Sequence, residues 1–346
     1  MSQDILFQEY GQIVKKVEEA LLQNPEWLAR YSDYALDEEA IGAIKKMRKT
    51  FRVRAPIFSY LTISKTIEAT KRAAKTATFD LRYQGLSIAD IIVSEKIGDK
   101  NDGYDVVMQI NERRAFTNLR DFGFAMPENA DGKAAWTLQD GKKFRAHFQQ
   151  EPVRTDKGNK KNEEHRVESE ILTYMRKTST AAGKVLCNMQ PVLLCGERFQ
   201  MPTPLSASKA KRGVIEYTKS FGGGIDILAR AGTGGANTNL CIIEVKDENK
   251  PDEPPQAAMK QAIAYATFIW RLLRADDNLG RKWWKMFGFG REIPAKLTLL
   301  AVVAMPAKPG DNEVPGAEID LDENDKIVLH YIDIDETTGK PMAKTF

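Results

Sequence analysis

Two carboxylates and one lysine stand in two short apolar segments of the chain. Asp226 lies within the segment FGGGIDILAR, and Glu244 and Lys246 lie on either side of Val245 further along. Carboxylate oxygens are hard ligands that suit Mg²⁺, which binds proteins through one or two carboxylates and retains several waters. Two carboxylates and an ammonium make a poor structural cluster but a good metal site. These residue types therefore predict a divalent-metal site with a lysine beside it.

Two predicted strands must bring these side chains together. Strand-like alternation covers residues 222–230 and again 239–247, with a glycine-containing turn between them. Side chains alternate between the two faces of a strand, so Asp226 points away from the neighbouring isoleucines, and Glu244 and Lys246 share a face. If the two strands are antiparallel neighbours, all three polar side chains converge on one face of the hairpin.

The rest of the second half of the chain supplies the flanking elements. A proline pair at Pro254–Pro255 is typical of a first helical turn, whose amides have no partners within the helix. The predicted order is a helix at 162–178, a hairpin-like strand pair at 185–205, the two strands above, a long helix from the proline pair to about residue 274, and strands at 296–305 and 326–334.

This order resembles the αβββαβ core of the PD-(D/E)XK nuclease superfamily, the restriction-endonuclease-like fold, over about residues 160–305. The resemblance implies that Asp226 and Glu244 are metal ligands, that the carbonyl of Val245 is a backbone ligand, and that Lys246 is the catalytic lysine. Ile225 stands where the family often has proline.

The resemblance also implies an acidic residue on the helix before the strands. This helix offers Glu163, Glu164, Glu168 and Glu170, of which Glu168 is the preferred candidate and Glu164 the second. The alternative is that all four are solvated helix charges. On the long helix, Gln261 and Tyr265 are four residues apart and share a face. The family often carries such a pair with the glutamine near the lysine, whereas Tyr265 also fits an apolar core stripe.

The activity implied by the resemblance is metal-dependent hydrolysis of phosphodiester bonds, with Mg²⁺ as the cofactor and Mn²⁺ as a substitute. The expected partner is nucleic acid, and DNA is preferred over RNA. The alternative is a catalytically silent nucleic-acid-binding or scaffold protein with the same fold. Endonuclease and exonuclease action both stay open. A homodimer would permit double-strand cleavage, but the sequence does not establish one.

The first part of the chain, residues 1–155, is predicted to form a separate α+β unit, with a linker before the nuclease-like domain at 160–346. Helices are expected at 36–51 and 64–76, followed by strands at 79–83, 88–93 and 104–110. The whole chain is therefore assigned to the α+β or α/β class. At 346 residues, two structural units are the natural expectation.

Basic residues gather near the start of the chain. Ten lysines and arginines lie between residues 41 and 75, against Glu68 alone, although the net charge is only +3. Such a segment can face a polyanion, or it can be an ordinary solvated surface. The candidates for nucleic-acid contact are Lys45, Lys49, Arg52, Lys71, Arg72, Lys209, Lys211 and Arg212.

The sequence predicts a cytoplasmic protein with no membrane partner. The N-terminal residues read as a helix with scattered acids rather than as a signal peptide. No run of about 18 apolar residues occurs. The three cysteines form no CxxC pair and are interpreted as reduced residues that pack in the protein interior.

Trp283 and Trp284 are flanked by cations. This pair fits either stacking on nucleic-acid bases or anchoring a loop to the core.

Overall fold

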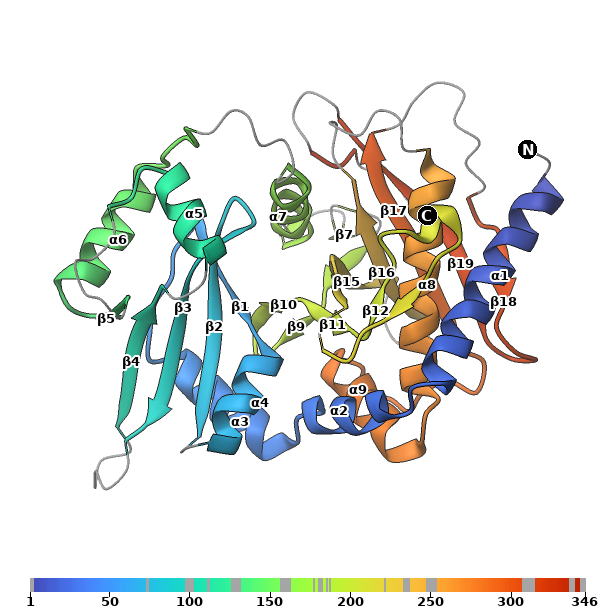
Figure 1. Ribbon diagram of the computed structural model, residues 1–346, viewed down its shortest axis with the longest axis horizontal. Helices are drawn as coiled ribbons and strands as arrows, with labels where there is room; N and C mark the ends of the chain where they lie inside the picture. The colour runs from blue at the N-terminus through green and yellow to red at the C-terminus, as the bar shows by residue number, and fades with distance from the viewer. Residues whose placement is uncertain are drawn as a thin grey trace. The chain divides into compact units, whose positions relative to one another are not determined.

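The computed structural model describes two units, each with its own sheet (Figure 1). Unit 1 comprises Met1–Ala35, Val167–Val192 and Gln200–Phe346, and unit 2 comprises Leu36–Arg166 and Leu193–Phe199. The described residues are 3–72, 75–96, 103–110, 113–125, 132–155, 163–176, 178–179, 183–184, 186, 188–220, 222–232, 237–246, 254–306, 315–335 and 340–342.

The division into units differs from the predicted boundary at two places. The N-terminal helices α1 (Gln3–Leu22) and α2 (Glu26–Tyr34) belong to unit 1, with the second half of the chain, and not to the unit formed by the residues that follow them. The short segment Leu193–Phe199 belongs to unit 2. Both differences are tertiary: a local pattern predicts a helix or a hairpin, but not the sheet or core against which it packs.

Unit 1 contains a mixed sheet with the strand order β18-β19-β17-β16-β15-β8 among the described residues. β8, β15 and β16 form an antiparallel run, whereas β16, β17 and β19 are parallel to one another. The mixed α+β class predicted from the sequence is confirmed. The strands are β8 (Met189–Pro191), β15 (Ile227–Gly232), β16 (Thr238–Val245), β17 (Thr298–Pro306), β18 (Glu318–Asp320) and β19 (Lys326–Ile334).

Helix α8 (Pro255–Leu273) connects two parallel strands of this sheet, β16 and β17. Parallel neighbours need such a crossover, because a tight turn cannot return the chain to the same end of the sheet. The helix begins with Pro254 as its N-cap and Pro255 in its first turn, as the sequence predicts. It packs against α1 as well as against β16 and β17. Its residues are therefore buried on several sides, which explains its nearly continuous apolar sequence.

Aromatic side chains hold α2 and α9 (Asp277–Met286) in the core of unit 1. The Tyr31 ring lies 5.0 Å from Phe268 of α8 and 5.9 Å from Trp283, and the Trp283 indole N–H donates to the Tyr31 carbonyl over 3.1 Å. Trp284 stacks on Phe289 with ring centroids 3.7 Å apart. Both tryptophans are buried, so the core-anchoring interpretation holds and base stacking does not.

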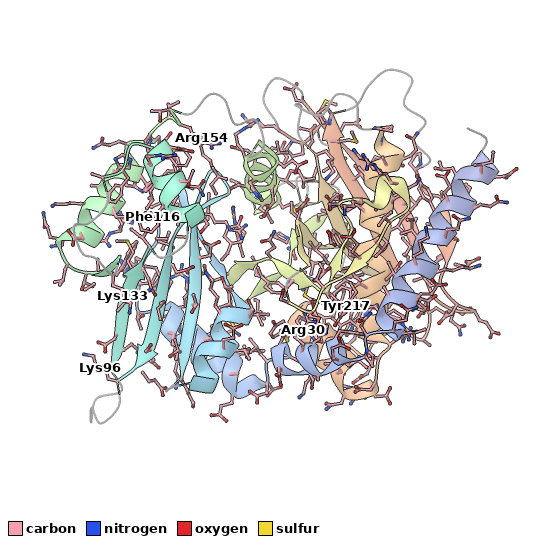
Figure 2. The ribbon with its side chains drawn as sticks, in the orientation of Figure 1. Arg30, Lys96, Phe116, Lys133, Arg154 and Tyr217 are labelled. Atoms are coloured by element: carbon pink, nitrogen blue, oxygen red, sulfur yellow. The ribbon has the colours of Figure 1, made fainter. Side chains whose placement is uncertain are left out.

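Short two-stranded ladders complete unit 1. α2 reaches one of them through Arg30, whose guanidinium donates to the Tyr217 hydroxyl over 3.0 Å (Figure 2). The ladders pair β6 (Thr178–Ser179) with β7 (Gly183–Lys184), β11 (Met201–Thr203) with β14 (Gly223–Ile225), and β12 (Leu205–Ser206) with β13 (Glu216–Tyr217); the 3₁₀ helix η2 (Ala210–Arg212) lies between β12 and β13 in sequence.

Unit 2 contains a sheet with the order β5-β4-β3-β2-β1-β10-β9 in the described part of the chain. Its members are β1 (Ile57–Leu61), β2 (Thr76–Tyr83), β3 (Leu86–Glu95), β4 (Tyr104–Gln109), β5 (Lys133–Ala135), β9 (Leu193–Leu194) and β10 (Glu197–Phe199). The predicted strands near 79–83, 88–93 and 104–110 are thus found. The hairpin expected at 185–205 is divided, because β8 joins unit 1 whereas β9 and β10 pair with each other in unit 2.

The helices of unit 2 follow the expected charge pattern. Asp37 caps α3 (Glu38–Arg48) by accepting a hydrogen bond from the Ala40 amide over 2.8 Å, and three basic residues occupy its last turn. Acids at the start and cations at the end both favour the helix dipole. The other helices are α4 (Ile63–Arg72), α5 (Arg113–Asp121) and α6 (Gln139–Gln149).

Candidate carboxylate site

Asp226 lies at the point where one predicted strand divides into two. β14 ends at Ile225 and pairs with β11, and β15 begins at Ile227 and pairs with β16. The β15–β16 ladder ends with Ile227 paired with Ile243, and continuing this register by one residue sets Asp226 across from Glu244. Directly opposed residues of an antiparallel pair point to the same face. The two carboxylates predicted to converge therefore share one face of the sheet.

The carboxylate of Asp226 is hydrogen-bonded to the backbone of the neighbouring strand. Its Oδ2 atom accepts a hydrogen bond from the Val245 amide over 2.9 Å. This contact fixes the direction of the Asp226 side chain, because one carboxylate oxygen is held by the neighbouring strand. Val245 itself is fully buried, and its predicted role as a backbone ligand through the carbonyl stays a prediction.

Glu244 and Lys246 form a buried ion pair. The Lys246 ammonium donates to Oε1 of Glu244 over 2.6 Å, and the two residues are 3% and 4% exposed. Lys246 follows the last residue of β16, and its amide donates to the Ala304 carbonyl of the adjacent region of β17 over 2.8 Å. Buried charges require close partners because desolvation is costly. The pair places one positive and one negative group beside Asp226.

Glu168 contributes a third carboxylate from another element. It lies on α7 (Glu163–Arg176), is 1% exposed, and acts electrostatically on Asp226. The two alternatives differ from it: Glu164 is half-buried and Glu170 is exposed. The preferred candidate is therefore the one of these three that the fold buries next to the strands. Asp226, Glu244, Lys246 and Glu168 are called the carboxylate site below.

Burial and the neighbouring charges raise the pKa of Asp226 well above its ordinary value. Burial is the largest cause, and the negative charge of Glu244 is the next; Lys246 opposes them, Glu168 adds to them, and the hydrogen bond from the Val245 amide lowers the pKa. Three carboxylates against one ammonium leave an excess of negative charge away from water. A cation bound among these oxygens would offset that excess.

Tyr265 places a hydroxyl group beside the same charges. Burial is the main reason that its pKa is raised, followed by the negative charge of Glu244. The Gln261 amide donates to this hydroxyl over 3.5 Å, one helical turn away on α8. Gln261 is thus brought to the site through Tyr265. Tyr265 is both a buried core residue and a neighbour of the carboxylates, so its two interpretations are compatible.

The three glycines before Asp226 are packed against three different neighbours. A Cβ atom at Gly222 would lie 2.6 Å from a Leu205 backbone atom, and one at Gly223 would lie 3.3 Å from the Tyr265 hydroxyl. One at Gly224 would lie 2.7 Å from the Gln200 side chain. The sequence alone does not identify these neighbours. At Gly223, a larger residue would therefore displace the Tyr265 hydroxyl.

The donor set suits a hard divalent cation. Asp226, Glu244 and Glu168 offer carboxylate oxygens, and Mg²⁺ characteristically uses one or two of these with waters for the rest. Within the described ranges, no group of three His, Cys, Asp or Glu side chains has the arrangement of a metal cage as it stands. The fit therefore rests on two opposed carboxylates and the excess negative charge, with water completing the coordination.

The predicted nucleic-acid contacts fall on both units. Lys45, Lys49 and Arg52 are exposed in unit 2. In unit 1, Lys209, Lys211 and Arg212 are exposed at η2, and Lys209 forms an ion pair with Glu216 over 2.8 Å. The side chains of Lys71 and Arg72 lie outside the described residues, although their backbone forms the end of α4.

Comparisons with known proteins give no relative. No family model, no curated protein and no solved structure matches the chain. Among the helices in the described residues, none is long and apolar enough to cross a membrane.

Proposed function

We propose that this protein is a metal-dependent nuclease of the PD-(D/E)XK type that hydrolyses phosphodiester bonds, with DNA as the substrate. The observation that carries the proposal is the carboxylate site: Asp226 opposite Glu244 on adjacent strands, with Lys246 bonded to Glu244 and Glu168 acting on Asp226. A structural role alone does not explain why an excess of negative charge is buried at one point, because such burial costs stability.

The order of the elements supports the same proposal. α7, β8, β15, β16, α8 and β17 occur in this order in the chain, although β6 and β7 lie between α7 and β8, β9 to β14 lie between β8 and β15, and α9 lies between α8 and β17. In the sheet, β8, β15 and β16 form an antiparallel run, and the helical crossover leads to the parallel strand β17. The order of these six elements supports the αβββαβ core that the proposal requires, with the other elements as insertions. Asp226 immediately precedes the middle strand, Glu244 lies near the end of the third strand, and Lys246 directly follows that strand.

The proposed chemistry assigns a role to each side chain. Asp226 and Glu244 would hold Mg²⁺ or Mn²⁺, with Glu168 reinforcing the negative field. When bound there, the cation polarises the scissile phosphate and lowers the pKa of a coordinated water. The Lys246 ammonium is held beside Glu244, where it can orient the attacking water and offset negative charge in the transition state. The Tyr265 hydroxyl lies beside these charges and accepts a hydrogen bond from the Gln261 amide.

Glu168 offers a sharp test of the metal-binding proposal because the same helix carries a matched control. Replacing Glu168 by Gln is expected to weaken Mn²⁺ binding by about tenfold or more, since it removes one buried negative charge near Asp226. Replacing the exposed Glu170 by Gln changes the charge of α7 equally and should leave binding unchanged. Calorimetric titration with Mn²⁺ gives the affinities directly, without reliance on turnover.

Two outcomes would decide against parts of this proposal. Equal Mn²⁺ affinity in both variants would remove Glu168 from the metal site. Absence of Mn²⁺ binding by the unaltered protein, with nucleic-acid binding intact, would favour the silent binding protein with the same fold.

A further inference from the structure

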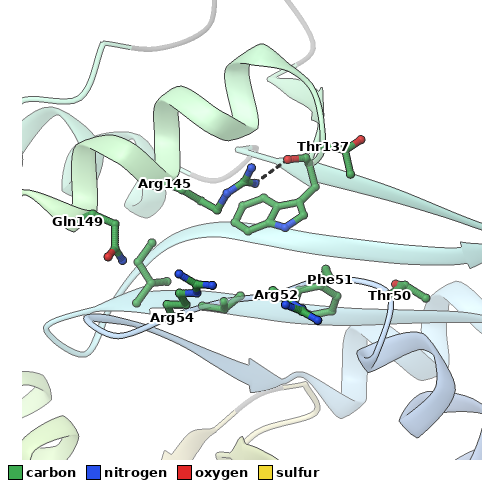
Figure 3. A pocket seen from close by; sticks show the side chains of 10 residues that line it. Thr50, Phe51, Arg52, Arg54, Thr137, Arg145 and Gln149 are labelled. Atoms are coloured by element: carbon green, nitrogen blue, oxygen red, sulfur yellow. Dashed lines mark hydrogen bonds between the residues drawn. The ribbon is translucent and has the colours of Figure 1, made fainter.

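A cavity of about 390 Å³ lies within unit 2 and shares no residue with the carboxylate site (Figure 3). Its wall includes three arginines, Arg52, Arg54 and Arg145, together with Trp136 and Gln149. No aspartate or glutamate is among the residues that line it. This volume is within the range of small-molecule binding sites, about 300–1,000 Å³.

Arg145 is held in place by Trp136. Its guanidinium lies 4.4 Å from the centre of the Trp136 ring and donates to the Trp136 carbonyl over 2.6 Å (Figure 3). Gly141 makes this possible, because a side chain there would collide with the same carbonyl as α6 passes over it. Partial burial lowers the pKa of Arg145, since desolvation opposes its charge. One cation of the cavity is therefore fixed in direction.

Arg52 and Arg54 come from the segment between α3 and β1. Both are exposed, and within the described part of the chain neither guanidinium group forms an ion pair or a hydrogen bond. The segment itself is attached to α6, because the Gln149 amide donates to the Ala55 carbonyl over 3.0 Å. The two guanidinium groups are thus carried on a tethered backbone beside a cavity that also contains Arg145.

Other arginines of unit 2 behave differently. Arg48 pairs with Glu197 over 2.5 Å, Arg82 with Asp80 over 2.6 Å, and Arg154 with Asp121 over 3.0 Å. In these three cases the unit supplies a carboxylate partner for the arginine. The three arginines of the cavity stand apart from this pattern. Like charges around one cavity repel each other, and an anion bound between them removes that repulsion.

We propose that this cavity binds the terminal phosphate of a nucleotide, either a free nucleoside 5′-phosphate or the 5′-phosphorylated end of a nucleic-acid strand. A phosphate monoester carries between one and two negative charges at neutral pH and three acceptor oxygens, which matches several guanidinium groups. A phosphodiester within a chain carries one charge and needs an open groove on both sides. The apolar side chains of Phe51, Val53 and Ile57 line the remaining wall and suit the attached nucleoside.

The test measures binding to the full-length protein in the presence of a chelator, so that hydrolysis at the carboxylate site plays no part. The probes are the common deoxynucleoside 5′-monophosphates, each tested alone, and a short single-stranded oligonucleotide prepared with and without a 5′-phosphate. The variant is Arg52→Ser with Arg54→Ser. The control is Lys142→Ser with Lys143→Ser, which removes the same charge from exposed positions of α6 that do not line the cavity.

The proposal predicts phosphate-dependent binding that weakens about tenfold to a hundredfold in the arginine variant and persists in the lysine control. Equal affinity for the monophosphate and the phosphorylated oligonucleotide would assign the cavity to free nucleotides, and a large preference for the oligonucleotide would assign it to strand ends. Equal weakening in both variants, equal binding of the two oligonucleotides, or no binding of any phosphorylated probe would overturn it. None of these results depends on whether the proposed nuclease activity exists.

Discussion

At the scale of single residues, the carboxylate site concentrates negative charge where little water can reach it. The raised pKa of Asp226 means that the folded protein holds this proton more tightly than the unfolded chain does. Unfolding then releases a proton as the pH rises above the ordinary carboxyl range. The stability of the metal-free protein therefore falls as the pH increases from that range through the pKa of folded Asp226.

Replacing Asp226 by Asn should remove this penalty. The amide oxygen can still accept the hydrogen bond from the Val245 amide, and no buried charge forms at neutral pH. We expect the metal-free variant to be more stable than the unaltered protein at neutral pH, because the raised pKa of Asp226 no longer opposes folding there. We also expect Mg²⁺ to stop raising its melting temperature. Chemical unfolding from about pH 4 to 8 checks the first expectation, and a less stable variant at neutral pH would contradict it.

The stabilisation of the folded protein by Mg²⁺ should also depend on pH, in the opposite direction. A proton and a cation compete for the Asp226 carboxylate, so stabilisation of the unaltered protein by Mg²⁺ should grow as the pH rises. The Asn variant provides the control because it cannot ionise at this position.

At the scale of elements, the glycine run before Asp226 controls how closely β14 approaches its neighbours. A Cβ atom at Gly222 would meet backbone atoms of Leu205, which cannot rotate away, whereas one at Gly224 would meet the side chain of Gln200. Gly222→Ala should therefore destabilise the protein by about 1–3 kcal/mol through overpacking, and Gly224→Ala by clearly less. Thermal unfolding of the two variants compares them directly. Equal melting temperatures would show that the backbone of Leu205 yields as easily as a side chain.

The elements that carry the site could be predicted because their signals are local. Alternation marks β15 and β16, and the proline pair marks the start of α8. The break at Asp226 could not be predicted, because it depends on β14 pairing with β11 while β15 pairs with β16. The proximity of the Tyr265 hydroxyl to Gly223 likewise comes from packing between α8 and a distant strand.

At the scale of the whole molecule, the N-terminal helices belong to the unit that contains the carboxylate site. α1 packs on α8, and Trp27 and Tyr31 of α2 contact Phe268 of α8. The sequence shows that both segments are amphipathic or aromatic helices, but it does not show which core receives them. The basic residues of 41–75 differ in their surroundings. Among those whose side chains are described, Arg48 and Lys65 are half-buried and pair with Glu197 and Asp90, and the others are exposed.

Removing residues 1–35 should therefore damage unit 1 rather than unit 2. The truncation uncovers the face of α8 that α1 and α2 bury, including Phe268. We expect the truncated chain to lose protection from proteolysis within residues 200–306, while the region 36–155 retains it. Limited proteolysis with mass-spectrometric mapping distinguishes the two regions. Selective loss of protection in 36–155 would contradict the assignment of the N-terminal helices to unit 1.

The most direct test of the nuclease proposal is a cleavage assay on supercoiled plasmid, linear duplex and single-stranded DNA, with Mg²⁺ or Mn²⁺ and with a chelator. Asp226→Asn is the preferred inactive control because it is expected to fold at least as stably as the unaltered protein, and Lys246→Ala tests the lysine separately. We expect metal-dependent cleavage that both substitutions abolish. Metal-dependent cleavage that persists undiminished in Asp226→Asn would place the chemistry elsewhere, and no cleavage of any substrate with either metal would contradict the proposed activity.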